Sequence, residues 1–408
     1  MKACGLVVEY NPFHHGHIHH IQSARKVSDA DCIVAIMSGS FLQRGEPAIM
    51  DKFHRTRAAL RAGADLVLEL PYIYAVQSSA LFAKGAVRSL HEIGVQSLCF
   101  GSELGRIDPF IQTVEILQST QTTYDMIVKA YLDKGLSYPQ ASERAYHAVG
   151  IDDIDMTQPN NILGLSYVQA MKQAQLPIEA LTIKRIHNHY HDDAIHTAIA
   201  SATSIRKELL LNGLTNRAKQ SLPKSTAEEL LQYAHLANQW HHWEAYFPFL
   251  HYKVMTMDTQ QLATIHGVDE GLEHRLIQTS KKATSFYDWI NRMKTKRYTQ
   301  TRLQRMFVHI LTNTTKTDVH QAISQATVPY LRLLGMNTTG REFLHKQKKQ
   351  LNVPIVTNRK KNIPASFELD ERATNVYYSI LTPDRQQSLR KQEFTGPIII
   401  NDSTSEAW

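Results

Sequence analysis

The chain has 408 residues, 43% of them hydrophobic, and a formal net charge of +7 at pH 7. This length predicts about two or three domains with a real core, and without an apolar run of membrane-spanning length we expect no membrane span. Cys4, Cys32 and Cys99 are unclustered and lie in apolar, strand-like runs. They favour packed thiols in a reducing cytoplasm, and a strand that begins almost at the first residue leaves no room for a targeting segment.

The first twenty residues predict a strand, a turn and a helix. An apolar run from Ala3 to Glu9 leads into the segment YNPFHHGH, and the spacing of Ile18, Ile21 and Ala24 predicts a helix that begins near His17. The free N–H groups at the start of that helix point back toward the end of the strand. Such a helix end carries partial positive charge and suits a nucleotide phosphate.

Three residues in this turn favour a nucleotide. Gly16 would let a triphosphate approach the backbone closely, and His14 and His17 would flank it as donors that stabilise charge on the α-phosphate as pyrophosphate leaves. A pattern this short also arises by chance in a chain with 21 histidines. Its position after the first strand favours the nucleotide site.

The histidines of the same segment are also candidate metal ligands. His15, His19 and His20 are close in sequence, and neutral imidazole is a common metal ligand. No carboxylate or thiolate completes a ligand set there. We therefore expect no bound structural metal.

Strands and helices alternate through the first half of the chain. This order predicts a Rossmann-like α/β domain over residues 1–211, with a parallel sheet, right-handed crossovers and ligands at the carboxyl ends of the strands. From residue 212 to 408 the pattern is mainly helical. The elements expected after the first unit are strands Cys32–Met37, Leu66–Leu70, Ser97–Phe100 and Ile178–Ile186 and helices Asp51–Arg61 and Gln77–Ile93.

Polar segments follow several of these strands. SGSFLQRGEP comes after the second strand and FGSE after the fourth, and either could be an ordinary turn. Lys184 and Arg185 end the last strand, where they could meet phosphate or lie on the surface.

Two helix starts also carry polar residues. Asn160 could cap its helix or hydrogen-bond a base, and capping is the safer interpretation for Asn160 or Asn161 alone. The segment SATSIR begins another helix, where Ser204 and Arg206 could hold the β and γ oxygens of a nucleotide. An ordinary Ser/Thr cap is equally consistent with that segment.

Charge is unevenly distributed along the chain. From Gly271 to Lys361 there are 18 Lys and Arg against 4 Asp and Glu, a balance of +14, so the remainder carries about −7. The segment KTKRYTQTRLQR contains no acidic residue, which argues against a merely solvated helical surface. We therefore expect a polyanion, either RNA or DNA, to bind this region.

The segments EYNPFHHGH, SGSFLQRGEPA, FGSE, PNNILGLSY, SATSIR and KTKRYTQTRLQR together resemble the bacterial tRNA(Met) cytidine acetate ligases, which belong to the HxGH nucleotidyltransferase superfamily. The resemblance runs from residue 1 through at least Arg305. It implies that acetate and ATP form acetyl-adenylate and pyrophosphate, and that the wobble cytidine of elongator tRNA(Met) then takes the acetyl group to give N4-acetylcytidine. Together with the cysteines and the lack of a long apolar run, these observations predict a cytoplasmic enzyme that needs neither an obligate protein partner nor a membrane.

The chemistry of the site, the charge pattern and the resemblance together suggest roles for individual residues. His14 and His17 are expected to be catalytic, with Ser204 and Arg206 near the pyrophosphate, and Mg²⁺ is expected to accompany ATP. Of the two neighbouring asparagines, Asn160 rather than Asn161 is expected to contact ATP. The ATP-binding residues implied are Val7, Val8, Glu9, Tyr10, Asn11, Pro12, Phe13, His14, His15, Gly16, His17, Ile18, His19, His20, Gly101, Asn160, Arg185 and Ile186. The residues expected to bind tRNA are Lys294, Lys296, Arg297, Arg302 and Arg305.

Two other functions fit parts of the same evidence. A small-molecule adenylyltransferase that makes a dinucleotide or coenzyme would explain the HxGH pattern but would have no use for so large a basic region. A non-catalytic RNA-binding factor with an ATP site would explain both features. Release of pyrophosphate that depends on acetate would exclude that factor.

Overall fold

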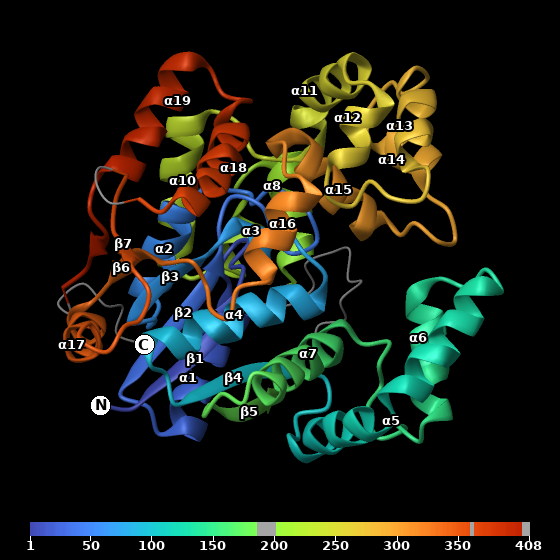
Figure 1. Cartoon of the computed structure of the whole chain (residues 1–408). Coiled ribbons are helices and arrows are strands. Elements are labelled where there is room, and N and C mark those ends of the chain that lie inside the picture. The colour runs from blue at the N-terminus through green and yellow to red at the C-terminus, as the bar shows by residue number, and fades with distance from the viewer. Residues whose placement is uncertain (186–200, 360–362, 402–408) are drawn as a thin grey trace.

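A computed structural model of the chain describes residues 1–185, 201–359 and 363–401. These residues contain one eight-stranded sheet with the order β5-β4-β1-β2-β3-β6-β7, and β8 pairs with β6 (Figure 1). The strands are β1 (Ala3–Val8), β2 (Cys32–Ser38), β3 (Leu66–Leu70), β4 (Ser97–Ser102), β5 (Glu179–Lys184), β6 (Leu331–Met336), β7 (Ile355–Val356) and β8 (Ile398–Ile399).

The first five strands are parallel to one another, which confirms the predicted α/β sheet. Their order places β1 in the middle, with β4 and β5 on one side and β2 and β3 on the other. The predicted strands agree with the observed ones to within about two residues. The carboxyl ends of these five strands therefore lie along one edge of the sheet, as doubly wound folds require.

Helices cover both faces of the sheet. Helices α1 (His15–Ser28) and α2 (Lys52–Arg61) pack on one face, and α4 (Ser79–Ile93) and α7 (Pro159–Gln173) pack on the other. Because successive side chains of a strand point to opposite faces, Leu6 and Ile33 belong to the core under α1, whereas Val34 belongs to the core under α4. Burial on both faces explains why the strands read as continuous apolar runs.

Three helical regions differ from the prediction. Helix α1 begins at His15 rather than near His17, because His14 caps it. The helix expected over Gln77–Ile93 begins at Ser79, after the separate short helix α3 (Tyr72–Ala75). Between β4 and α7 the chain also forms α5 (Asp108–Asp133) and α6 (Tyr138–Ala148), which the sequence analysis did not identify and which extend away from the sheet (Figure 1).

The second half is mainly helical, as predicted, but it is not only helical. Its strand β6 pairs antiparallel with β3, so the second half adds strands to the edge of the parallel sheet. The division at residue 211 stays a prediction, and the sheet extends across it. The helices are α8 (Ala202–Asn212), α9 (Asn216–Gln220), α10 (Lys224–Ala237), α11 (Trp243–Thr256), α12 (Thr259–Thr264), α13 (Leu272–Ser280), α14 (Phe286–Met293), α15 (Gln300–Thr312), α16 (Lys316–Ile323), α17 (Thr338–Gln347), α18 (Glu368–Tyr378) and α19 (Pro383–Arg390), with short 3₁₀ turns at Ala365–Phe367 and Lys391–Phe394. No helix in the described ranges is long and apolar enough to cross a membrane.

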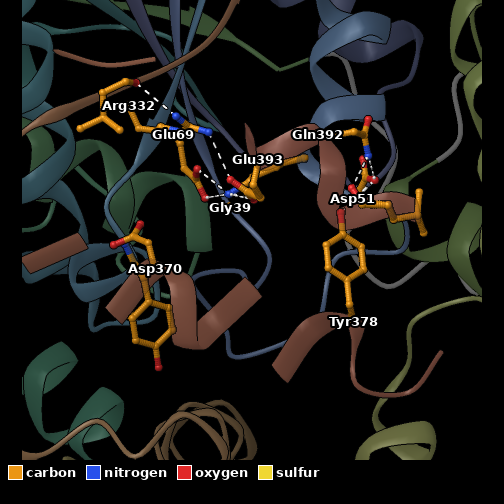
Figure 2. A network of polar contacts seen from close by, with 12 residues as sticks. Gly39, Asp51, Glu69, Arg332, Asp370, Tyr378, Gln392 and Glu393 are labelled. Carbon is orange, nitrogen blue, oxygen red and sulfur yellow. Dashed lines mark hydrogen bonds and ion pairs between the residues drawn. The ribbon is translucent and has the colours of Figure 1, made fainter. Parts of the chain in front are cut away.

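A buried ionic network joins the two halves of the chain (Figure 2). Lys52 Nζ lies 2.8 Å from Glu69 Oε2 and 2.8 Å from Glu393 Oε1, and Arg332 Nη2 lies 3.2 Å from Glu393 Oε2. Each of these four side chains is at most 4% exposed. Two cations and two carboxylates therefore compensate one another between α2, β3, β6 and the C-terminal segment.

A fifth ionisable group lies beside this network. Asp370 accepts hydrogen bonds from the backbone N–H of Tyr72, at 3.0 Å, and from the hydroxyl of Tyr330. Burial raises the pKa of Asp370 to about 7, and the nearby carboxylate of Glu69 adds to this effect. The neighbouring negative charge therefore favours a proton on Asp370 near neutral pH.

We predict that Lys52→Met destabilises the fold by about 3–5 kcal/mol, because it leaves two buried carboxylates without their shared cation. Urea denaturation at neutral pH measures this change. Lys224→Met is the matched control, since the Lys224 side chain is 82% exposed and its Nζ makes only a long contact, 4.0 Å, with Glu228 Oε1. Equal unfolding midpoints for the two variants would contradict the role assigned to the network.

Candidate active site

The polar segments that follow β1, β2, β4 and β5 meet at one cavity, together with the start of α8. This is the carboxyl edge of the parallel strands, where the sequence analysis expected a ligand. The cavity is lined by Glu9, His14, Gly16, His17, His19, His20, Leu42, Arg44, Glu46, Gly101, Ile183, Arg185, Ser201, Ala202, Thr203 and Arg206.

His14 and His17 cap the start of α1 reciprocally. The backbone N–H of Gly16 donates to His14 Nδ1 at 3.0 Å, and the backbone N–H of His14 donates to His17 Nδ1 at 3.1 Å. This is a capping box in which two imidazole rings take the places usually held by a hydroxyl and a carboxylate. The two histidines of the HxGH pattern therefore shape the helix end and line the cavity at the same time.

The capping contacts determine where the ring protons lie. A ring nitrogen that accepts a hydrogen bond carries no proton, so in the neutral rings of His14 and His17 the proton is on Nε2. Burial lowers the pKa of His14 to about 3, and Arg185 adds to this effect. Burial and His14 likewise hold the pKa of His17 well below its ordinary value. Both rings are thus neutral and carry an Nε2–H donor that the capping contacts do not use.

Gly16 is required by this arrangement. A Cβ atom at position 16 would lie 2.8 Å from Cε1 and 3.0 Å from Nδ1 of His14. Any larger residue would therefore displace the His14 ring from the N–H that it caps. The glycine of the pattern thus protects the geometry of the cap as well as giving room for a ligand.

Arg206 connects two of the loops around the cavity. Its guanidinium donates to the backbone carbonyl of Asn11 at 2.9 Å and to Glu46 Oε2 at 3.0 Å. These contacts come from the loops after β1 and β2 and hold the Arg206 side chain at the cavity wall.

Arg185 enters the cavity from the end of β5. Its Nη1 lies 3.4 Å from Asn160 Oδ1, while Asn160 Nδ2 donates to Glu103 Oε1 at 2.6 Å. Arg185 lines the cavity, whereas the neighbouring Lys184 does not. Arg44, Arg185 and Arg206 therefore give the cavity wall three guanidinium groups beside the carboxylates of Glu9 and Glu46.

The two asparagines at the start of α7 have different surroundings, and neither is the N-cap. Gln158 holds the N-cap position, and the Glu103 carboxylate instead accepts the N–H of Asn161 at 3.0 Å. Asn161 is buried, and its Oδ1 accepts the N–H of Glu103 at 3.2 Å. Capping was therefore the wrong interpretation for both residues. Asn160, which contacts Arg185, is the one oriented toward the cavity wall.

Arg55 holds the loops that carry these residues. It is fully buried on α2 and donates to the backbone carbonyls of Glu9 and Ser38, both at 2.8 Å, of Gly39, and of Met50 at 3.2 Å. These carbonyls belong to the ends of β1 and β2 and to the loop between β2 and α2. One side chain thus fixes the positions of two of the segments that line the cavity.

Several residues that were expected to contact ATP lie beside the cavity but do not line it. Val8, Tyr10, Asn11, Phe13 and Ile18 are buried, and like Val7, Pro12, His15 and Asn160 they do not line the cavity. Ser204 is also buried, and its hydroxyl donates to the carbonyl of Ser201 at 2.9 Å within the first turn of α8. Ile186 lies outside the described residues.

Several residues that line the cavity were not among the predicted site residues. Leu42, Arg44 and Glu46 lie in the SGSFLQRGEP segment, and Ser201 and Thr203 lie in SATSIR. The available signal was the position of these segments after predicted strands or at a predicted helix start. Which side chains of the SGSFLQRGEP segment face the cavity depends on the turn from Leu42 to Glu46, in which the N–H of Leu42 donates to the carbonyl of Glu46 at 2.9 Å.

The basic segment before and within α15 is more strongly paired than its sequence suggests. Arg297 Nη2 lies 2.6 Å from Glu270 Oε1, and Arg302 Nη2 lies 3.8 Å from Glu270 Oε2. Glu270 comes one residue before the stretch in which the charges were counted. Lys294 and Lys296 are exposed. The surface therefore keeps a net positive charge although two of its arginines share a carboxylate.

We predict that the free energy of unfolding falls as the pH is lowered from 7 to 5, because buried neutral histidines cannot take the proton that they gain when unfolded. Burial lowers the pKa of His20 to about 4, and its Nε2–H donates to the carbonyl of Cys99 at 3.2 Å. His20→Gln keeps a donor there but removes the titrating imidazole. Denaturation at several pH values should then show that the free energy of unfolding depends less steeply on pH, by about 1 kcal/mol per pH unit between pH 5 and 6. The exposed His345 provides the control His345→Gln. Equal slopes for His20→Gln and the parent chain would contradict the prediction.

The geometry of the site agrees with comparisons to known proteins. A family model described as HIGH Nucleotidyl Transferase matches residues 1–393. The chain is 48% identical to the tRNA(Met) cytidine acetate ligase of Oceanobacillus iheyensis, over 98% of this chain and 100% of that one, and 46% identical to that of Anoxybacillus flavithermus, over 98% and 100%.

Solved structures agree as well. The apo crystal structure of Thermotoga maritima TmcAL superimposes with a TM-score of 0.91 at 32% identity, covering 98% of this chain and 100% of that one. A second crystal structure of that protein, bound with alpha-thio ATP, gives a TM-score of 0.88 with the same identity and coverage. This chain therefore belongs to the tRNA(Met) cytidine acetate ligase family of the HIGH nucleotidyl transferases.

Proposed function

We propose that this protein joins acetate to the wobble cytidine of elongator tRNA(Met) at the expense of ATP, giving N4-acetylcytidine, AMP and pyrophosphate. The observation that carries the proposal is the pair of neutral imidazoles, His14 and His17, at the start of α1 in a cavity lined by Arg44, Arg185 and Arg206. The names of the relatives support the choice of tRNA, and the alpha-thio ATP bound to Thermotoga maritima TmcAL supports the choice of nucleotide.

In the first step an oxygen of acetate attacks the α-phosphorus of ATP. The bond from the α-phosphorus to the bridging oxygen breaks, and pyrophosphate leaves with the electron pair. The Nε2–H groups of His14 and His17 would donate to the α-phosphate oxygens as their charge increases. Because both rings are neutral, they can do so without gaining or losing a proton.

The arginines would hold the leaving group. Arg206 is already fixed by Asn11 and Glu46 and can bind pyrophosphate oxygens with little further ordering. The hydroxyls of Ser201 and Thr203 lie at the same wall. Ser204, whose hydroxyl bonds within α8, would act through the shape of that first turn.

Mg²⁺ fits the donors of this site. Glu9 and Glu46 line the cavity, and Mg²⁺ in nucleotide sites binds one or two carboxylates together with phosphate oxygens. When bound, it would neutralise part of the triphosphate charge. Glu9 Oε1 accepts the N–H of Gln43 at 2.9 Å, which leaves Oε2 for the ion.

In the second step the exocyclic amine of the cytidine attacks the acetyl carbonyl carbon. The carbon–oxygen bond to AMP breaks, AMP leaves with the electron pair, and the amine loses a proton. The amine is a weak nucleophile because its lone pair is delocalised into the ring, so an activated acetyl donor is needed. The base must also leave the anticodon stack, and Lys294, Lys296, Arg297, Arg302 and Arg305 would hold the RNA while it does so.

The cell compartment follows from the substrate. The pool of tRNA to be modified is cytoplasmic, and the three cysteines are buried free thiols, as a reducing compartment favours. We place the enzyme in the cytoplasm.

The proposal is tested with the full chain, ATP, Mg²⁺, radiolabelled acetate and unmodified elongator tRNA(Met). Label should enter N4-acetylcytidine after digestion to nucleosides, and it should be absent without ATP. The matched control is the same tRNA with uridine at the wobble position, which has no exocyclic amine. Turnover of ATP with a phosphate ester but no label in RNA would instead identify a small-molecule adenylyltransferase, and RNA binding without acetate-dependent pyrophosphate release would identify a non-catalytic factor.

We predict that His17→Asn lowers acetate-dependent ATP–pyrophosphate exchange by roughly 100- to 1,000-fold, the usual loss when one transition-state donor is removed. Asparagine keeps an acceptor near the Nδ1 position for the N–H of His14 but removes the Nε2–H donor. His17→Gln, which can place a donor near Nε2, should retain more exchange activity. Binding of tRNA should be nearly unchanged in both. Full exchange activity in His17→Asn, with an unchanged melting temperature, would remove His17 from the reaction.

A further inference from the structure

Arg305 differs from the other basic residues of its segment. Arg297 and Arg302 share the carboxylate of Glu270, whereas the guanidinium of Arg305 forms no hydrogen bond or ion pair with the residues that the structure describes. Its neighbours are themselves cationic. Burial lowers the pKa of Arg305 to about 10, and Arg302 and Arg44 add to this effect. A partly buried guanidinium among like charges has donors that require an anionic acceptor.

The backbone next to Arg305 packs directly on the wall of the cavity. Gly45 has a φ of +79°, and a Cβ atom there would lie 2.4 Å from the backbone nitrogen of Arg305 and 2.5 Å from the carbonyl carbon of Gln304. Gly45 therefore allows α15 to touch the turn from Leu42 to Glu46. Within that turn the N–H of Gly45 donates to the carbonyl of Leu42 at 2.8 Å.

The same turn contributes Arg44 and Glu46 to the cavity. The cavity and the basic surface of α15 are thus opposite sides of one short turn. Arg305 lies at this junction, because its backbone nitrogen packs against Gly45 of the turn. It does not itself line the cavity.

We infer that Arg305, assisted by Arg302 and Arg44, binds a phosphodiester of the tRNA beside the nucleotide whose base enters the cavity. Phosphate oxygens match the fork of a guanidinium, and a convergence of cations becomes favourable when an anion binds between them. The phosphates of ATP offer the same chemistry. Because Arg305 lies outside the cavity, the structure favours the RNA phosphate as its ligand.

This inference rests on the proposed function and gives it a geometric requirement. The base can reach the acetyl group only when its own backbone is held at the mouth of the cavity. A phosphate bound at Arg305 would set that distance through the Gly45 contact. Arg305 is therefore expected to affect both the binding of tRNA and the rate of acetyl transfer from bound tRNA.

The test compares Arg305→Gln with Arg292→Gln in the full chain. Arg292 is an exposed arginine of α14 that already pairs with Asp288 at 2.9 Å. For Arg305→Gln we expect the KM for elongator tRNA(Met) to rise by roughly tenfold and kcat for acetyl transfer to fall. The log-log dependence of tRNA affinity on salt should become shallower by about 0.7 to 0.9, as for one lost phosphate contact. Acetate-dependent ATP–pyrophosphate exchange, which needs no tRNA, should be unchanged.

Arg305→Lys is the second variant and keeps the charge without the fork. It should bind tRNA better than Arg305→Gln and show the parent salt dependence. A raised KM for ATP in the exchange reaction, with an unchanged KM for tRNA, would overturn the inference and assign Arg305 to the triphosphate. Unchanged kinetics in both reactions, or equal losses in both together with a lowered melting temperature, would also overturn it. If the parent chain places no label in RNA, the proposed function fails instead, and that result is read before any variant is compared.

Discussion

The buried guanidinium of Arg55 is the contact on which the arrangement of the site depends. It donates to carbonyls of Glu9, Ser38, Gly39 and Met50, so it ties the ends of β1 and β2 to α2. Carbonyl groups at strand ends would otherwise need water or other donors. With one planar group, Arg55 satisfies three carbonyls at or next to strand ends and a fourth at Met50, just before α2. It thereby holds the loops after β1 and β2 in place beside the cavity.

Above this support, the site separates two kinds of electrostatic group. The histidines at the start of α1 are neutral donors whose orientation is set by backbone N–H groups, and the arginines that line the same cavity are permanent cations. Orientation by the backbone makes a carboxylate partner for each imidazole unnecessary. A carboxylate in that place would raise the pKa of the ring and add negative charge at the proposed triphosphate site. The reciprocal cap thus provides alignment without an electrostatic penalty.

The features that could be predicted from sequence are local and periodic. Strands β1 to β4 are apolar runs that alternate with helical spacing, and the HxGH pattern marks the helix start by itself. The pairing of β6 with β3 could not be predicted in this way, because it joins segments far apart in the chain and its companions β7 and β8 are only two residues long. The surroundings of Asn160 and Asn161 on α7 likewise depend on Glu103, which follows β4 and is far away in sequence. The pairing of Arg297 and Arg302 was missed because Glu270 precedes the basic stretch and meets it only in three dimensions.

The antiparallel pairing of β6 with β3 also affects the way this protein is synthesised. Strand β3 is an apolar run whose outer edge presents unpaired N–H and C=O groups until Leu331–Met336 has been translated. The nascent chain therefore carries an open sheet edge throughout synthesis of the helices between them. Such an edge is a site of aggregation, and closing it requires a long-range contact that forms slowly. The edge of the sheet that lines the cavity is encoded first, but β3 gains its second neighbour only after Leu331–Met336 has been translated.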